Sequence, residues 1–566
     1  MTLEESRSLL HEGEFIHSGF HDLTDRLDGK PVAMLPGNSG DSLIVATDTD
    51  KLLYFAYNEN SETWEKRQTI PSPLGDGERM TTVNWLFGDM SLVLGGDRGS
   101  LKIFSLYPHP QADGAALRLF GETKKFPPLN GPVQHYAASG INRSFLVSSP
   151  HAVRLCYGTT ADIRWESDRL DFSPVQLAAN AEFNSMLATD GQGRIHFFSI
   201  KDRHPEAGSK ALVGKIWYEG YDSPKWLWQS VGGTDDYESK LSLMPLVFGT
   251  LKGTLYALVF AVPVAVMAAV YTAHFMPPSV KRVVKPVMEI MASLPSVVLG
   301  FFGALYLAPR MEDKVPALVC MVILIPSLAA LIAWFWTTRP AAWRNKFSNG
   351  LEYIVMKPVI LLCAWFCWEY LGYWLEQPFI SLTRGIMSLW GAGDFQAASF
   401  ADLWRNGFGM PYEQRNSLVV GFVMGFAVIP VIFTISEDAL SNVPPSLIAA
   451  SEALGASRWQ IVRTVVLPVA SAGIFSALMI GLGRAVGETM IVLMATGNTP
   501  IMDWNIFNGM RTLSANIATE LPEAAQDSTH YRVLFLGGLI LFSMTFILNT
   551  LAEIVRQRLR KRFNVV

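Results

Sequence analysis

Short and long apolar runs divide the chain into two parts. From about Leu35 to Tyr237, brief apolar runs alternate with Gly, Asp, Asn, Ser and Pro, and none is long enough to cross a bilayer. After Pro245, the apolar segments reach about twenty residues, enough for a helix to cross a hydrocarbon core of about 30 Å. We therefore predict an all-β domain at residues 1–240 and an all-α polytopic membrane domain at residues 241–566.

Repeated hairpin patterns indicate the architecture of the first part. Each reads as strand, polar turn and strand, and the second strands recur at intervals of roughly 40 to 50 residues, as in the blades of a propeller. The copies are Ser42–Tyr57, Ser91–Tyr107, Ser185–Ile200 and a weaker one at Phe145–Tyr157. The pattern resembles a WD40-like β-propeller. Because the Trp-Asp dipeptide of true WD repeats is missing, an irregular β-sandwich is the alternative.

Seven apolar segments in the second part are long enough to cross the membrane as helices. They are Leu246–Phe275, Met288–Leu307, Val315–Trp336, Val355–Leu375, Leu418–Ile435, Val469–Gly497 and Val533–Val555. The chain ends in a basic tail, Arg556–Arg562, which predicts a cytoplasmic C-terminus by the positive-inside rule. Seven crossings then place the β domain on the outer side of the membrane.

The first residues contain no signal that would carry the β domain across the membrane. Met1–Glu14 is polar and charged where a signal peptide requires an apolar core. We therefore expect an N-terminal transmembrane segment that is missing from the displayed start, or else one miscounted helix.

Composition and sequence motifs exclude several kinds of partner and site. Hydrophobic residues make up 50% of the 566 residues, and the net charge is only −4, so no nucleic-acid partner is expected. Of the four cysteines, only Cys156 lies in the β part, and the histidines there are scattered, so we predict no disulfide and no metal site in it. No Gly-x-x-x-x-Gly-Lys-Ser/Thr loop occurs, so the chain is not expected to bind or hydrolyse ATP.

Between the fifth and sixth segments stands a loop with a characteristic spacing. The run Ala449–Ser457 precedes Val465–Pro468, so that a Gly is followed after fixed intervals by Val and by Leu-Pro. The loop, residues 438–468, resembles the EAA loop of ABC importer permeases, a coupling helix that docks on the ATPase subunit. The resemblance assigns this contact to Glu452, Gly455, Ala456, Leu467 and Pro468.

One position of this loop departs from the family. The family glutamate is Ala449 here, and Glu452 is displaced by three residues. We expect Gly455 to break one short helix and Pro468 to start the next membrane helix. An ordinary helix-turn-helix on the membrane surface is the alternative.

The sixth segment contains ionisable residues, which are costly inside a membrane and usually functional. Arg484 and Glu488 stand four apart, which would put both side chains on one helix face. Small residues around them predict close helix packing, at Gly481, Gly483 and Gly487.

This stretch resembles the matching helix of phosphate permeases of the PstC and PstA type. Further similarities are Pro245–Leu251, Leu294–Gly300 and Thr512–Ala518. The resemblance implies that Arg484 and Glu488 belong to the translocation path, where a guanidinium suits phosphate because its planar fork donates two parallel hydrogen bonds. A purely structural ion pair is the alternative.

The resemblance also implies a location in a bacterial inner membrane, with the β domain in the periplasm, and a set of partners. They are a second, PstA-like permease subunit, a dimeric PstB-like ATPase that carries ATP and Mg²⁺, and a periplasmic PstS-like phosphate-binding protein, assembled among membrane lipids. The external β domain and the extra helices of Val315–Leu375 resemble enlarged PstC-like proteins. Two alternatives stay open: a permease for sulfate or molybdate, and a propeller-bearing membrane receptor without transport.

Overall fold

We describe the fold from a computed structural model of the 566-residue chain. The structure describes residues 21–563 except 59–60, 76, 111–115, 168–169, 235, 313, 339–350 and 390–396. Contacts divide the chain into two compact units, one ending at Ser242 and the other beginning at Leu243. Each unit is described by itself.

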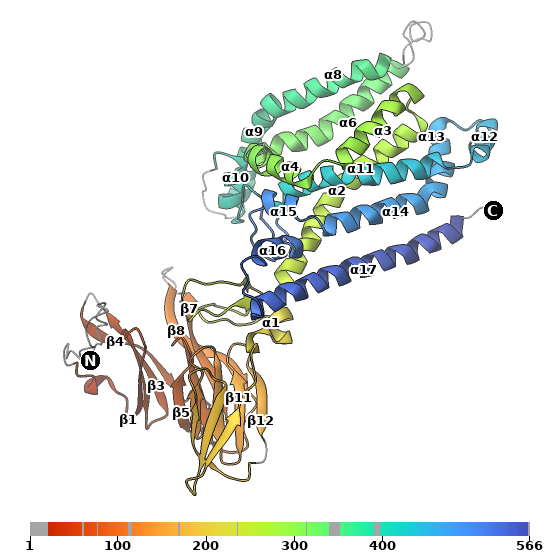
Figure 1. Ribbon diagram of the computed structural model, residues 1–566. Coiled ribbons are helices and arrows are strands. Elements are labelled where there is room, and N and C mark those ends of the chain that lie inside the picture. Colours follow the sequence, from red (N-terminus) through yellow and green to blue (C-terminus); the bar gives the residue numbers. More distant parts are fainter. Residues whose placement is uncertain are drawn as a thin grey trace, which may run out of the picture. The chain divides into compact units, whose positions relative to one another are not determined.

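The first unit is built of small antiparallel sheets whose strands follow one another in chain order (Figure 1). The first two sheets are β1 Pro31–Pro36, β2 Ser42–Thr47, β3 Lys51–Asn58, β4 Thr63–Pro71, and β5 Met80–Trp85, β6 Ser91–Gly96, β7 Leu101–Pro110, β8 Ala116–Phe126. The next two are β9 His135–Ala138, β10 Ser144–Ser149, β11 Ala152–Tyr157, β12 Asp162–Ser167, and β13 Pro174–Ala179, β14 Ser185–Asp190, β15 Ile195–Ser199.

These sheets confirm the predicted repeats. The four hairpin patterns form the strand pairs β2–β3, β6–β7, β10–β11 and β14–β15. Four separate meanders, rather than two large facing sheets, give the unit the blade-like organisation of a propeller and not that of the β-sandwich. The inner strands β6, β10 and β11 are buried at every position, as expected of strands covered on both faces by neighbouring sheets.

Apolar side chains between neighbouring sheets form the core of this unit. Leu52 of the first sheet packs with Leu92 of the second, Val93 of the second with Val147 of the third, and Leu146 of the third with Met186 of the fourth. The sheets therefore pack in sequence order, each burying the face that its predecessor leaves open.

A buried ion cluster ties the last part of this unit back to the sheets. The Arg143 side chain, 8% exposed, lies 2.8 Å from Glu219 and 3.4 Å from Glu238. Tyr157 and Thr159 also donate hydrogen bonds to Glu238. Burial raises the pKa of Glu238, and the guanidinium of Arg143 opposes that rise. The last part of the unit contains η2 Pro205–Ala207, α1 Ser209–Val213, β16 Trp228–Gln229 and β17 Lys240–Leu241. At the start of the unit, η1 Thr24–Arg26 precedes β1.

The second unit is helical. Its elements up to the extra hairpin are α2 Met244–His274, α3 Pro278–Ala292, α4 Ser296–Phe301, η3 Phe302–Leu307, α5 Ala308–Glu312, α6 Val315–Thr337, α8 Leu351–Phe366, η4 Cys367–Leu371 and α9 Gly372–Leu389. The rest are α10 Phe400–Asp402, η5 Leu403–Gly407, α11 Ser417–Ser441, α12 Pro445–Ala453, α13 Arg458–Ile461, η6 Val462–Val466, α14 Leu467–Val486, α15 Met490–Ala495, α16 Leu513–Glu520 and α17 Thr529–Phe563.

Six helical runs of the described residues are long and apolar enough to span a membrane, or seven if one bent pair is a span. The bent pair is Pro278–Ala292 with Ser296–Glu312, which turns by 83°. The predicted segment Met288–Leu307 is therefore wrong as a straight helix. Ser293, Leu294 and Pro295 interrupt it, since a proline disfavours helical backbone in the residue before it.

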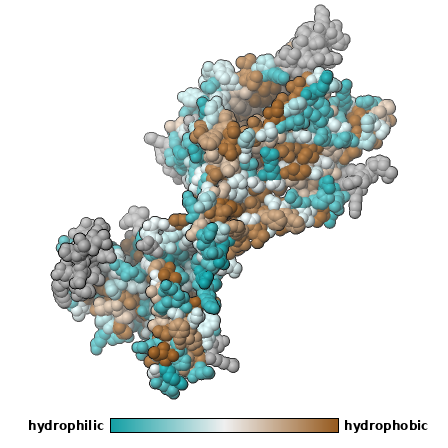
Figure 2. All heavy atoms as spheres, in the orientation of Figure 1, coloured by the Kyte–Doolittle hydropathy of each residue, from teal (hydrophilic) through white to brown (hydrophobic). Residues whose placement is uncertain are grey.

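The surface of the helical unit has the composition expected beside lipid. Figure 2 shows extensive hydrophobic areas on it. On the extra helices, Trp334 is 66%, Leu361 69% and Trp374 78% exposed. Large apolar side chains this exposed on a helix indicate contact with lipid or with other membrane helices.

Small residues bring the central helices together. On α2, Ala257, Ala261, Ala265 and Ala269 recur every fourth position, and all are fully buried. On α11, a Cβ at Gly425 would stand 3.0 Å from the Ala257 carbonyl oxygen. Close backbone approach through small residues is the usual means of helix association in membranes, because lipid removes most of the hydrophobic driving force. α11 thus lies packed between α2 and α14.

The helical unit has two functional ends (Figure 1). α11 and α17 run toward the end that carries α12 and α13, whereas α14 runs from there to the end that carries α15 and α16. The predicted coupling loop and the basic C-terminal helix end are therefore on the same side of this unit.

Candidate functional sites: a capped loop and a broken helix

The predicted coupling loop is a short helix closed by a complete cap. α12 ends at Ala453, and Gly455 follows with a φ of +82°, which glycine adopts without the steric penalty of a side chain. The Gly455 N–H donates to the Glu452 carbonyl at 2.9 Å, and the Ala456 N–H donates to the Ser451 carbonyl at 3.2 Å. This pair of bonds is a Schellman motif, which satisfies carbonyls that the helix end would leave bare.

The next helix begins with an equally complete cap. The Ser457 hydroxyl accepts from the Gln460 N–H at 3.4 Å, and the Gln460 side chain accepts from the Ser457 N–H at 2.8 Å. Two caps in a row satisfy the backbone groups of both helix ends within the turn itself, which restrains the angle between α12 and α13.

The tip of this loop presents apolar side chains to its surroundings. Leu454 is 90% and Trp459 58% exposed, and α12 buries none of its residues. Glu452 is also exposed, whereas Ala456 packs partly against the helical core. A rigid, exposed, partly apolar projection is suited to dock in a groove of another protein.

The predicted role of Pro468 as the start of a membrane helix is wrong. A single helical run extends from Arg458 to Val486, and Pro468 is its eleventh residue. In a regular α-helix, the proline ring would clash with the carbonyl of Thr464. Here the wider π-helical turn η6 precedes it, closed by the Leu467 N–H on the Val462 carbonyl.

The second site is a break in the sixth predicted segment. α14 ends at Val486 with Gly487 as its cap, and α15 begins at Met490. Val469–Gly497 is therefore two helices rather than one. Interrupted helices expose backbone groups at membrane depth, which is tolerated where the break is buried in protein or lines a cavity.

The break separates Arg484 from Glu488. Because Glu488 lies beyond the end of α14, the two residues do not share a helix face, and within the described chain no ion pair within 4.0 Å joins them. The Glu488 carboxylate instead accepts from the Ile491 N–H at 3.4 Å, at the start of α15. Both side chains are half-buried. The structure thus contradicts the predicted pairing and leaves the guanidinium available to another anion.

Neighbouring helices contribute polar groups that sequence reasoning did not single out. The Ser514 hydroxyl of α16 donates to the Glu488 carbonyl oxygen at 3.1 Å, and the Thr250 hydroxyl of α2 accepts from the Leu513 N–H at 3.0 Å. Both residues lie in stretches that we compared with the phosphate permeases, at Thr512–Ala518 and Pro245–Leu251. That similarity was the available signal, but it did not indicate which side chains meet.

The three glycines near the break differ in their surroundings. A Cβ at Gly481 would stand 2.5 Å from Ile432 on α11, closer than side chains tolerate. A Cβ at Gly483 would meet its nearest atom, on Asn549, at an ordinary 3.5 Å, and one at Gly487 would meet nothing nearer than 3.7 Å. Close approach of α14 to α11 therefore depends on Gly481.

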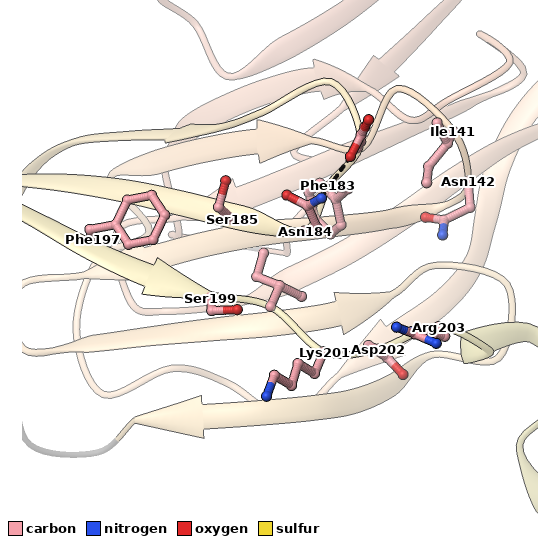
Figure 3. A pocket seen from close by; sticks show the side chains of 12 residues that line it. Ile141, Asn142, Phe183, Asn184, Ser185, Phe197, Ser199, Lys201, Asp202 and Arg203 are labelled. Atoms are coloured by element: carbon pink, nitrogen blue, oxygen red, sulfur yellow. Dashed lines mark hydrogen bonds between the residues drawn. The ribbon is translucent and has the colours of Figure 1, made fainter.

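A separate hollow lies in the β unit, beside the edge strand β15 (Figure 3). Its volume is about 1020 Å³, and its lining includes Phe183, Phe197, Lys201 and Arg203. Phe197 is 69% exposed. No three or more His, Cys, Asp or Glu side chains of the described residues gather here, or elsewhere in them, as a metal site would require.

Residues 261–563 match the family described as "binding-protein-dependent transport system inner membrane component". This is 303 of 566 residues, more than half of the chain, and it contains the capped loop and the broken helix. The chain belongs to this family. The β unit lies outside the matched residues.

Similar proteins within the family carry one recurrent name. The chain is 40% identical over 148 residues to "phosphate transport system permease protein PstC 1" of Mycobacterium tuberculosis, an alignment that covers 26% of this chain and 44% of that protein. It is 28% identical over 263 residues to PstC of Mesorhizobium japonicum, covering 46% of this chain and 75% of that one. The chain thus spans less than half of the mycobacterial protein.

The β unit has a weaker likeness to a solved structure. It is the β-propeller domain of Cps50 (Swd1) from Myceliophteria thermophila, at 15% identity and a TM-score of 0.25, covering 30% of this chain and 51% of that one. A likeness of this size carries no conclusion about the unit's function.

Proposed function

We propose that this chain is the transmembrane permease subunit of an ATP-driven phosphate importer. The observation that carries the proposal is the similarity to proteins named phosphate permeases. It is supported by Arg484, which stands at a helix break and has no ion-pair partner within 4.0 Å among the described residues. A guanidinium binds phosphate through two parallel, charge-assisted hydrogen bonds, each stronger than a neutral one.

The importer would work by alternating access. Nucleotide-driven closure of a separate ATPase subunit would move α12 and the turn that follows it, where exposed Leu454 and Trp459 offer the docking surface. Because α12 connects α11 to the helical run ending at the break, its motion would change the surroundings of Arg484 and Glu488. Substrate would then lose its contacts on one side of the membrane and gain access to the other.

Partners and orientation are part of the same proposal. A PstA-like second permease, a dimeric PstB-like ATPase that holds ATP and Mg²⁺, and a PstS-like binding protein would complete the transporter. The N-terminus of α2 and the C-terminus of α17 lie at opposite ends of the helical unit, which supports a periplasmic β unit and a cytoplasmic coupling loop.

Uptake of labelled phosphate tests the function. In cells that carry this permease as their sole high-affinity route, excess unlabelled phosphate should abolish uptake, and excess sulfate or molybdate should leave it unchanged. Equal competition by sulfate would replace phosphate by a broader oxyanion substrate. Cells without the chain, supplied with the other subunits, are the control, and uptake equal to theirs would contradict a transport role.

A further inference from the structure

A fully buried carboxylate stands near the end of α11, outside the two sites described above. The Glu437 side chain is 0% exposed, and its oxygens lie 2.5 Å from Lys281 Nζ and 2.6 Å from Lys285 Nζ. Both lysines belong to α3, and the Ser441 hydroxyl donates to Glu437 at 2.6 Å. We call Lys281, Lys285, Glu437 and Ser441 the α3–α11 cluster.

Because Glu437 is buried, losing its contacts with the two lysines would be energetically costly. A carboxylate removed from water is costly unless it is paired and hydrogen-bonded, and removing its partners leaves a charge that the interior does not tolerate. Asp438, one residue further on, also contacts Lys285 at 3.2 Å, but it is 57% exposed and contributes little. Among the described residues, Glu437 therefore provides the buried ionic contact between α3 and α11.

The cluster adjoins the coupling loop. Ser441 is the last residue of α11, and α12 begins at Pro445. Between them, Val443 is buried in the helical core, so the connection has little slack. Lys281 Nζ also donates to Ser441 at 3.2 Å. A displacement of α12 would therefore act directly on the cluster.

On its other side, the cluster leads to the broken helix. α3 continues through the 83° bend into α4. A Cβ at Gly300 of α4 would stand 2.9 Å from the Met490 carbonyl oxygen and 3.3 Å from the Ile491 Cα. α4 therefore packs backbone to backbone on α15, whose first residue follows Glu488 by two positions.

We propose that the α3–α11 cluster transmits motion of the coupling loop, through α3 and α4, to α15 at the helix break. The proposal rests on the importer function proposed above. It adds a second connection beside the covalent one through α13 and α14, so that both sides of the break, Arg484 and Glu488, respond to the same loop. Glu437 is a positioning residue, because it contacts neither substrate nor nucleotide.

The test is a Glu437→Gln variant of the full chain, co-expressed with its partner permease and ATPase subunits and reconstituted in liposomes with phosphate-loaded binding protein. Basal ATPase activity should stay within about twofold of the wild type. Stimulation by the binding protein and phosphate uptake should both fall, by about 5- to 150-fold, the range of coupling between linked sites.

Asp438→Asn is the matched control, since it removes a neighbouring carboxylate that contacts the same Lys285 at the surface. It should leave stimulation and uptake within about twofold of the wild type. Lys285→Gln is the second variant, because it leaves Glu437 paired with Lys281 and hydrogen-bonded to Ser441. It should lower stimulation by a smaller factor than Glu437→Gln does, because the carboxylate keeps part of its pairing.

The results for these variants distinguish a transmitting cluster from a static anchor, and both from a failure of the proposed transport function. If Glu437→Gln lowers only the amount of assembled complex, while stimulation and uptake per complex equal the wild type, the cluster is a static anchor and the inference is wrong. If Glu437→Gln does not assemble, Lys285→Gln decides in the same way. If the wild-type complex itself shows no phosphate uptake, the proposed function fails, and the inference fails with it.

Discussion

The two interruptions of the helical unit are built in opposite ways. At Leu454–Ser457, backbone hydrogen bonds and a capping box satisfy the helix ends locally, and the tip is exposed. At Gly487–Thr489, the backbone is held partly by other helices, through Ser514 on the Glu488 carbonyl, while Arg484 has no ion-pair partner within 4.0 Å among the described residues.

The difference separates a mechanical part from a chemical one. A turn that satisfies its own hydrogen bonds keeps its shape when its neighbours move, as a docking element must. A break whose groups depend on adjacent helices changes when those helices shift, and a half-buried arginine beside it can exchange partners. Substitutions in the turn should therefore impair coupling to the ATPase, whereas substitutions at the break should impair substrate binding.

The largest effect is expected at the tip of the coupling loop. Gly455→Val should abolish phosphate uptake and stimulation of the ATPase, because a β-branched residue at φ +82° costs at least about 1–2 kcal/mol and the turn would refold. The matched control is Gly385→Val in α9. Apart from the helix's own backbone, no atom of the described residues lies within 4 Å of an added Cβ at either position, so the two substitutions differ chiefly in backbone conformation. Wild-type uptake by Gly455→Val would remove the coupling role.

Removing the guanidinium at the break should have the next largest effect. Arg484→Gln should raise the phosphate concentration for half-maximal uptake by about 10- to 150-fold, corresponding to the roughly 1.5–3 kcal/mol of hydrogen bonds to a charged group. Arg484→Lys keeps the charge but loses the planar fork of the guanidinium. Its half-maximal phosphate concentration should therefore lie between those of the wild type and of Arg484→Gln. Concentration-dependent uptake by equal amounts of assembled complex measures this, and an unchanged Arg484→Gln variant would make the residue structural.

The packing of α14 on α11 gives a smaller, two-sided prediction. Gly481→Ala should destabilise the chain by about 1–3 kcal/mol, since its Cβ would meet Ile432 at 2.5 Å. Gly483→Ala should be neutral or stabilising by up to about 1 kcal/mol, because alanine favours the helix and the space is free. Thermal unfolding in detergent compares the two, and Ile432→Ala should rescue Gly481→Ala. Equal effects at both positions would contradict the assigned contact.

The smallest effect should come from the cap of α13. Ser457→Ala removes the capping box and should cost about 0.5–2 kcal/mol locally, so that amide hydrogens near Arg458–Ile461 exchange faster. Uptake should drop by less than for Gly455→Val. Ser451→Ala is the control, since among the described residues the Ser451 hydroxyl donates to the Leu447 carbonyl within α12 and takes no part in the cap of α13. Unchanged exchange in Ser457→Ala would mean that the loop does not hold its own shape.

The division into a β unit and a helical unit followed from the sequence, as did the four hairpin repeats. Periodicity and segment length are local properties, so each blade and each long helix is recorded in its own residues. Gly455 was found for the same reason, because a left-handed helix cap depends on one residue type at one position.

The interactions that distinguish the two sites were decided by tertiary structure. Arg484 and Glu488 stand at helical spacing, so the sequence predicts a pair, but the helix ends between them where α15 turns to pack on α4 and α16. Gly481 differs from Gly483 through its contacts with Ile432 and Val428, about fifty residues earlier in the chain. Glu437 meets lysines more than 150 residues away. Spacing reports what one segment can do alone, whereas partners brought together by packing decide which of its side chains are paired, buried or free.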